Sequence, residues 1–286
     1  MSFNDTHIRE GKLGAGAFGE VFKVCERTTG KRFALKIIKC SNDNELNSVM
    51  DEMKALSKLD HPNIIRFFDT KHTQNKKDSA EISLLLEYCP RGTLSKRLLR
   101  PSSKQRHMQW MRQLADAVAY IHSKTLVHRD LKPDNIMLTD GENIKVGDFG
   151  LSREFVALKE DDETWESYYM TNGCGTLLSM APEVFGGHYT EKADVFALGV
   201  LFYAIAERQC LELLGAKYYG AFVHDNKGNK VPLGFQMFKD GNGLRVTFHK
   251  THVHLAEIIC SALLLDQKKR PSAAAIQGNL NDYVSL

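Results

Sequence analysis

The chain of 286 residues contains 43% hydrophobic and 26% charged residues, values typical of a soluble globular protein, so long disordered stretches are not expected. A net charge of +3 is too small to indicate nucleic acid or a membrane surface as a partner, and no run approaches the roughly 18 apolar residues of a membrane span. Six scattered cysteines without a CxxC pair, and a start without an apolar leader, predict reduced thiols in the cytoplasm or the nucleus.

The first third of the chain predicts mainly β-strands. Residues 12–26 and 31–40 alternate apolar and polar side chains, which is the period of a half-buried strand. From about residue 44 to 59 the apolar residues recur at helical spacing, and a His-Pro pair ends that helix. Apolar runs at 64–68 and 82–88 predict two more strands, joined by a polar loop.

The rest of the chain predicts helices, with strong apolar stripes at 108–122, 192–207 and 255–265. We therefore expect an α+β fold with two lobes. Its parts are a small antiparallel β-sheet lobe with one helix at about 1–86, a hinge at 87–92, and a larger, mainly α-helical lobe at about 93–286.

A glycine-rich motif, GAGAFGEV, occupies residues 14–21. Alone it is weak evidence, because similar glycines open dinucleotide-binding folds. In those folds the last glycine begins a helix, whereas here a predicted strand at 20–25 follows directly. A glycine loop between two strands suits a flap whose backbone amides fold over phosphates.

Two charged residues follow the glycine loop. Lys36 ends the sequence FALK on the next predicted strand, where a lysine pairs with α- and β-phosphates. Glu52 lies on the predicted helix, where the partner of that lysine is expected. Each has an ordinary alternative, an exposed lysine at a strand end or a glutamate on a helix surface, so both interpretations depend on the other motifs.

The densest motif is HRDLKPDN at residues 128–135, which matches a phosphoryl-transfer loop at every defined position. In that pattern Asp130 accepts the proton of a substrate hydroxyl, Lys132 neutralises charge on the phosphoryl group, and Asn135 holds Mg²⁺. Asp148 then opens a DFG sequence, whose aspartate bridges Mg²⁺ to the phosphates. The remaining expected elements follow in order: Gly175-Thr176, Ala181-Pro182-Glu183, Asp194, and Arg270 as a structural ion-pair partner of Glu183.

In this order and spacing the motifs resemble the eukaryotic protein kinase superfamily over residues 8–284. The resemblance implies a two-lobed fold, protein substrates, and ATP with Mg²⁺ as cofactors. It implies catalytic roles for Asp130, Lys132, Lys36, Glu52 and Thr176, and Mg²⁺ ligation by Asn135 and Asp148. The implied nucleotide contacts also include Leu13, Gly14, Ala15, Gly16, Ala17, Phe18, Gly19, Val21, Ala34, Leu86, Glu87, Cys89 and Met137.

Two residues make the chain similar to the Ser/Thr class. Lys132 stands two places after Asp130, whereas tyrosine kinases usually carry alanine and arginine in that loop. Thr176 is the second residue, and its hydroxyl would bond Asp130 and Lys132. Ser179 departs from the family, which has an aromatic residue there, and Leu177-Leu178 replace more polar residues or proline. The substrate-docking surface of the family is therefore not carried over.

A finer resemblance, on residues 187–208, 212–215 and 231–234, is to the Clik-type kinases that interact with PDZ-LIM proteins, and it implies a PDZ-LIM adaptor as a partner. Stress-responsive translation-factor kinases, which share the style of segments 86–94 and 122–133, are the nearest alternative. A pseudokinase scaffold and a small-molecule phosphotransferase are rival functions. Pseudokinases usually lose the lysine, the HRD aspartate or the DFG aspartate, and small-molecule phosphotransferases generally lack the APE segment. This sequence has all four features.

Arg129 precedes Asp130, as in kinases whose activation loop is ordered by phosphorylation, because a buried arginine binds a phosphate bidentately. We expect Arg153 as the second cation and Thr171 as the phosphorylated residue. In the alternative, the acidic run 160–163 already supplies the charge and no switch is needed.

Two weaker patterns complete the sequence. Six basic residues between 91 and 106 are interpreted as a solvated helix face, with docking of an acidic substrate or a nuclear signal as alternatives. His249, His252 and His254 resemble a metal-binding cluster, but no cysteine or carboxylate is placed to complete four ligands. The sequence leaves open the oligomeric state and whether the chain is a whole protein.

Overall fold

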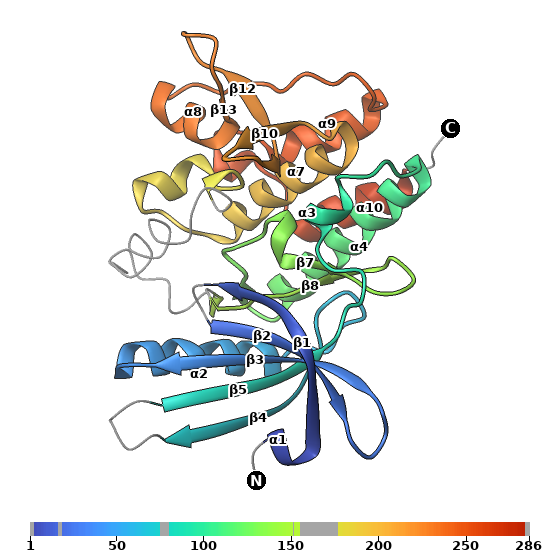
Figure 1. The fold of residues 1–286 in the computed structure, drawn as a ribbon. Helices are drawn as coiled ribbons and strands as arrows, with labels where there is room; N and C mark the ends of the chain where they lie inside the picture. Colours follow the sequence, from blue (N-terminus) through green and yellow to red (C-terminus); the bar gives the residue numbers. More distant parts are fainter. Residues whose placement is uncertain (1–2, 17–18, 75–79, 151, 155–176, 284–286) are drawn as a thin grey trace.

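The computed structural model describes residues 3–16, 19–74, 80–150, 152–154 and 177–283, which form two lobes (Figure 1). A small β-rich lobe lies at the N-terminal end and a larger helical lobe at the C-terminal end, which confirms the predicted α+β architecture. Within the described ranges, no helix is both long and apolar enough to cross a bilayer.

Five antiparallel strands form the sheet of the small lobe in the order β1-β2-β3-β5-β4. The strand predicted to begin at Ile64 starts only at Phe67, because Ile64 and Ile65 are buried in the preceding loop and the Ile65 N–H donates to the Val146 carbonyl at 2.8 Å. The strands are β1 (His7–Gly16), β2 (Gly19–Glu26), β3 (Arg32–Cys40), β4 (Phe67–Gln74) and β5 (Ala80–Glu87).

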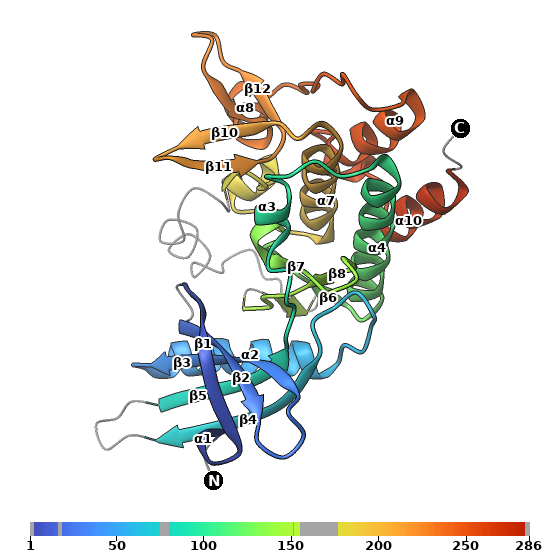
Figure 2. The ribbon, with the colours of Figure 1, turned by 45° about the vertical axis from the view of Figure 1, so that its right-hand side comes forward.

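A helix covers each face of this sheet. Helix α2, Asp43–Ser57, begins at Asn42, whose side chain accepts a hydrogen bond from the Glu45 N–H as an N-cap. Its Val49 packs on the inner face against Ile38, Cys40, Ile82 and Leu84. The short helix α1, Phe3–Thr6, lies at the outer face (Figure 2), where Phe3 joins a second cluster with Val24, Phe33, Leu35, Ile37 and Leu85.

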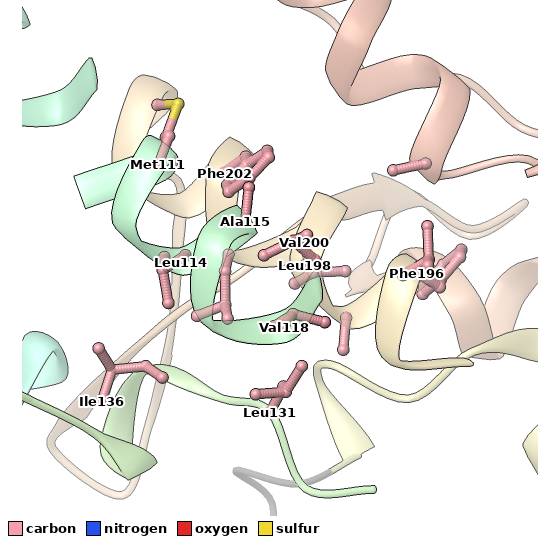
Figure 3. Close-up of a cluster of buried hydrophobic side chains, with 14 of the residues drawn as sticks. Met111, Leu114, Ala115, Val118, Leu131, Ile136, Phe196, Leu198, Val200 and Phe202 are labelled. Carbon is pink, nitrogen blue, oxygen red and sulfur yellow. The ribbon is translucent and has the colours of Figure 1, made fainter. Parts of the chain in front are cut away.

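The large lobe is built around α7, Glu191–Glu207, which is buried on nearly every side. Such a helix needs no polar stripe, and the sequence is accordingly apolar from residue 195 to residue 206, with one glycine. Figure 3 shows part of this core, where Leu114 and Val118 of the neighbouring helix gather with Leu198 and Phe202 of α7. The other helices are α3 (Leu94–Arg97), α4 (Lys104–Ser123), α8 (Leu233–Asp240), α9 (Val253–Ala262) and α10 (Ala273–Asp282).

Two β-hairpins between α7 and α8 were not predicted. The first turns at Leu214 and Gly215, which have φ angles of 51° and 77°, and the second has Gly228 at φ 80°. Because a Gly-containing turn between short apolar runs is a hairpin signal, the sequences LLGA and DNKGNK carried the information. The four strands are β10 (Cys210–Leu213), β11 (Ala216–Tyr219), β12 (Phe222–His224) and β13 (Lys230–Pro232).

Candidate active site

A buried aspartate of α7 holds the loop that begins at His128, after β6 (Leu126–Val127). Asp194 accepts hydrogen bonds from the backbone N–H of His128 at 2.8 Å and of Arg129 at 2.9 Å, and it lies 3.0 Å from Nε2 of His122. Arg129 has a φ of 70°, a conformation that disfavours residues with a side chain, so the loop needs this support. Burial alone would raise the pKa of Asp194, but the hydrogen bonds from His122 and the loop outweigh it and lower the pKa.

Asp130 lies in this loop with two partners on its carboxylate. Lys132 Nζ is 2.9 Å from Oδ2 of Asp130, and Asn135 donates from Nδ2 to the same oxygen and to the Asp130 carbonyl, each at 2.8 Å. Burial raises the pKa of Asp130 above its usual value, although Lys132 opposes the change. The loop therefore presents a fixed carboxylate that is more basic than a free aspartate.

The DFG turn follows β8 (Ile144–Val146) and is fixed to the same loop. The Gly147 N–H donates to the Asn135 carbonyl at 2.9 Å, and the Gly147 carbonyl lies 3.0 Å from Nε2 of His128. Phe149 is fully buried with its ring centroid 4.7 Å from that of His128. Asp148 adopts a φ of 60° in this turn, and its carboxylate meets the small lobe at Lys36.

Lys36 binds two carboxylates, Glu52 of its own lobe and Asp148 of the large lobe. Its Nζ lies 2.7 Å from Glu52 Oε1 on α2 and 3.2 Å from Asp148 Oδ1. Burial would lower the pKa of Lys36, but the two negative charges outweigh it and raise the pKa, so the ammonium group stays protonated. At Glu52 the effect of burial exceeds that of the Lys36 charge, so the pKa of Glu52 is raised. At Asp148 burial would also raise the pKa, but the charge and hydrogen bond of Lys36 outweigh it, so the pKa of Asp148 is lowered.

The residues predicted to contact the nucleotide include some from each lobe. The register of the sheet pairs Ala34 of β3 with Leu86 of β5, and it places Val21 of β2 opposite Lys36. From the large lobe, Met137 of β7 (Ile136–Leu138) pairs with Thr93, just after the hinge. Their contact with a nucleotide remains a prediction.

Of the two loop glycines whose surroundings are described, Gly14 and Gly19, only Gly19 is sterically required by its conformation. Gly19 has a φ of 113°, and a Cβ built on it would lie 2.0 Å from the carbonyl oxygen of Ile37. A Cβ on Gly14 would meet nothing within 4 Å. Gly19 therefore fixes how closely the glycine loop approaches β3, whereas a side chain at Gly14 would meet open space.

The hinge is held by its neighbours on both sides. The Glu87 N–H donates to the Arg66 carbonyl at 2.9 Å, and the Glu87 carboxylate binds Lys145 Nζ at 2.7 Å. Burial, with Glu87 adding to it, raises the pKa of Cys89 to about 12. The Cys89 thiol is therefore protonated near neutral pH and a poor nucleophile.

The protein kinase domain family matches residues 7–279, which is nearly the whole chain. The chain belongs to the protein kinase family. Its relatives include the interferon-induced, double-stranded RNA-activated protein kinase of Mus musculus, which is 33% identical over 240 residues, covering 77% of this chain and 44% of the relative. Calcium-dependent protein kinase 5 of Plasmodium berghei is 29% identical over 264 residues, covering 91% of this chain and 42% of the relative. Aurora kinase B of Danio rerio is 35% identical over 209 residues, covering 71% of this chain and 60% of the relative. The chain thus spans about half the length of the kinases it matches.

This kinase domain has its ion pair between Glu183 and Arg270 as expected. Two guanidinium nitrogens of Arg270 bind the carboxylate at 2.6 and 2.8 Å, and Arg270 is 1% exposed.

Sequence reasoning missed Tyr189, which donates to Asp194 at 3.2 Å and lies with its ring centroid 4.9 Å from Cζ of Arg129. No sequence signal around Tyr189 singled it out.

Several predicted site residues cannot be placed. Ala17, Phe18, Thr171 and Thr176 lie outside the described residues, and of Arg153 only the backbone, in β9 (Arg153–Glu154), is described. Their roles remain predictions.

The two weaker sequence patterns have structural explanations. In the basic run, Arg97 and Arg106 both bind Glu142, at 2.7 and 3.3 Å, and Arg91 lies 3.5 Å from Asp140. Arg97 and Glu142 are each 17% exposed, so this part of the run is paired with carboxylates and not simply solvated. Within the described ranges, which include the three histidines 249, 252 and 254, no group of side chains is arranged to hold a metal ion.

Proposed function

We propose that this domain is an active serine/threonine kinase, which transfers the γ-phosphate of ATP to Ser or Thr hydroxyls of proteins. The observation that carries the proposal is the set of contacts around Asp130, whose carboxylate is held by Lys132 and Asn135. A pseudokinase scaffold has no need of a buried carboxylate with raised pKa beside an ammonium group. The Ser/Thr preference is supported by Lys132, and the kinase relatives above are compatible with it.

Protein kinases generally use ATP and Mg²⁺, and the side chains present fit the metal. The Asn135 amide nitrogen is used by Asp130, which leaves the amide oxygen for a hard cation, and Asp148 adds a carboxylate of lowered pKa. When bound there, Mg²⁺ would neutralise charge on the phosphates. Lys36, kept charged by Glu52 and Asp148, would hold the α- and β-phosphates.

In the transfer step the substrate hydroxyl oxygen forms a bond to the γ-phosphorus while the bond to the leaving oxygen of ADP breaks. Asp130 orients the hydroxyl and accepts its proton, and Lys132 Nζ, 2.9 Å from the Asp130 carboxylate, lies where it can stabilise charge on the transferred group. Asn135 keeps Asp130 in place through two hydrogen bonds of 2.8 Å. Positioning and charge stabilisation thus supply the catalysis.

The decisive variant is Asp130→Asn, which keeps the shape of the side chain and removes the base. We expect loss of phosphate transfer to a mixed Ser/Thr peptide library with labelled ATP, while ATP still raises the thermal unfolding temperature. A variant as active as the wild type would contradict Asp130 as the base. A wild-type domain that binds ATP without transfer would favour the scaffold.

Regulation and cellular setting are proposed on sequence grounds. We propose that phosphorylation of Thr171 activates the domain through Arg129 and Arg153, that it acts in the cytoplasm or nucleus, and that a PDZ-LIM adaptor is a partner. Arg129 is buried next to the ring of Tyr189, so its guanidinium is near the loop end that an activating phosphate would reach. Unchanged turnover of Thr171→Ala would remove the regulatory proposal.

A further inference from the structure

A row of aromatic rings lies on the outer face of the small lobe, away from the candidate active site. Phe3, His7, Phe33 and Phe68 contact one another in sequence, edge to face, with centroid separations of 5.6, 5.6 and 5.0 Å. The first three rings are buried, and Phe68 is 36% exposed. The rings come from α1 and from the first residues of β1, β3 and β4, whose backbones are drawn in the small lobe (Figures 1 and 2).

Basic side chains lie over these rings. Lys31 Nζ is 4.9 Å from the centroid of Phe68 and 5.2 Å from that of Phe33, and Arg66 Cζ is 5.6 Å from the centroid of Phe68. Two further cations follow the same pattern. Lys71 Nζ lies 4.3 Å from the centroid of Phe3, and Arg9 Cζ lies 4.6 Å from that of Phe22, a ring that packs against the same outer cluster. We define the basic face as these four residues: Arg9, Lys31, Arg66 and Lys71.

The basic face differs from other charged parts of the small lobe. No member has an ion-pair partner in the part of the chain that the structure describes, whereas Lys12 binds Glu20 at 2.6 Å. The neighbouring carboxylate, Glu10, is already engaged by Lys23 at 2.7 Å and Arg32 at 3.1 Å. A ring attracts a cation by about 0.5–1 kcal/mol at an exposed site but does not neutralise its charge. Two other nearby carboxylates are engaged as well: Glu20 binds Lys12, which lowers the pKa of Glu20 with a smaller contribution from Arg9, and Glu87, beside the Arg66 backbone, binds Lys145. The four charges therefore leave a net positive potential over one face.

We propose that the basic face is a docking surface for an acidic peptide segment of a partner protein. Carboxylates of the segment would pair with the four cations, and an apolar side chain would contact the exposed part of Phe68. Single-stranded nucleic acid fits less well, because binding it without sequence readout relies on free ring faces for stacking. Phe3 and Phe33 are 4% and 6% exposed, and Phe68 already carries two cations.

This surface is separate from the proposed phosphate transfer. Phe33 belongs to the outer cluster of the sheet, whereas Lys36 points to the opposite side, where it binds Glu52 of α2. An acidic segment could therefore bind while the catalytic cleft is free, and its binding can be tested without measuring kinase activity.

The test is fluorescence anisotropy of the whole chain with a labelled peptide that alternates glutamate and leucine. We expect saturable binding that weakens with added salt, because exposed charges are screened. Reversal of one cation, in Lys31→Glu or Arg9→Glu, should weaken binding at least about fivefold, since it removes one pair and adds a repulsion. The matched control is Lys268→Glu, a substitution of an exposed lysine in the large lobe that changes the net charge by the same amount. The affinity of this variant for the acidic peptide should equal that of the wild type.

Thermal unfolding of each variant shows whether it is folded, and Lys31→Gln, with an expected loss of about twofold, serves if the reversals unfold. Three results would overturn the proposal: no saturable binding at low salt, equal weakening by Lys268→Glu, or equal binding of a peptide that alternates lysine and leucine. Tighter binding of an oligouridylate probe than of the acidic peptide would also overturn it, in favour of nucleic acid.

Discussion

The buried ion pair of Lys36 and Glu52 gives the sharpest prediction about how the small lobe holds the lysine that meets Asp148 of the large lobe. Glu52→Gln keeps the size of the side chain and one acceptor oxygen but removes the charge 2.7 Å from the lysine. Both side chains are nearly inaccessible, 9% and 3% exposed, so water cannot replace the lost partner. Breaking a buried pair costs about 3–5 kcal/mol.

The cost here should be smaller, about 1–3 kcal/mol, because Asp148 remains 3.2 Å from Lys36 as a second counter-charge and the amide can still accept a hydrogen bond. For a chain of this size that corresponds to a fall in Tm of roughly 2–10 °C. The same variant should lower kcat/KM for ATP, because the lysine is no longer fixed over the phosphates.

The assay is thermal unfolding of Glu52→Gln beside Glu20→Gln. The control removes the same charge from a lysine–glutamate pair of nearly equal length, 2.6 Å, in which both side chains are about half exposed. We expect no measurable change in Tm for the control, since exposed pairs contribute little. Equal shifts in the two variants would refute the reasoning that burial makes the Lys36 pair important.

Three further predictions concern single positions. Gly19→Ala should raise KM for ATP by about tenfold or more, because its Cβ would lie 2.0 Å from the Ile37 carbonyl oxygen at a φ of 113°, whereas Gly14→Ala, with open space, should change it little. Steady-state kinetics checks both, and equal values would contradict the loop geometry. The folded-state pKa of Asp194 is lowered, so its contribution to stability is present above the unfolded pKa of about 3.9 and is lost as the pH falls through the folded pKa. In urea unfolding at a series of pH values, Asp194→Asn should therefore reduce stability at pH 7 and flatten its decline in acid, and an unchanged acid slope would argue against this linkage. Leu214→Asn should stabilise the β10–β11 hairpin by about 0.5–1 kcal/mol, because Leu214 has a φ of 51° and asparagine tolerates that region better. A lower midpoint in the same urea assay would show that the fully exposed Leu214 side chain has another role.

The motifs predicted the two lobes and the family because each motif is a local sequence with a fixed place in one fold. The hairpins between α7 and α8 were missed because their strands have only three or four residues and little alternation. The start of β4 was predicted too early because a buried loop residue such as Ile64 is as apolar as a strand residue.

At the candidate site, the sequence supplied the charged residues but not how they are held. Residue types gave Asp130, Asn135 and Lys36 through their motifs. The loop that carries Asp130 is also held by distant residues: Asp194 accepts hydrogen bonds from the backbone of His128 and Arg129, and the Tyr189 ring lies against Arg129, both from a segment more than fifty residues away in sequence. Such contacts arise only when the helix carrying them is packed against the loop, so spacing alone cannot show them. The basic face is likewise built from separate segments, and no run of basic residues announces it.

The central claim, transfer of phosphate from ATP to Ser or Thr, is tested most directly by a positional-scanning peptide array with radiolabelled ATP. The array should hold matched peptides with Ser, Thr or Tyr as the only acceptor, and each should be incubated with the wild type and with Asp130→Asn. We predict label on Ser and Thr peptides with the wild type, little on Tyr peptides, and none with the variant. Label on Tyr peptides alone, or equal label with both proteins, would contradict the account.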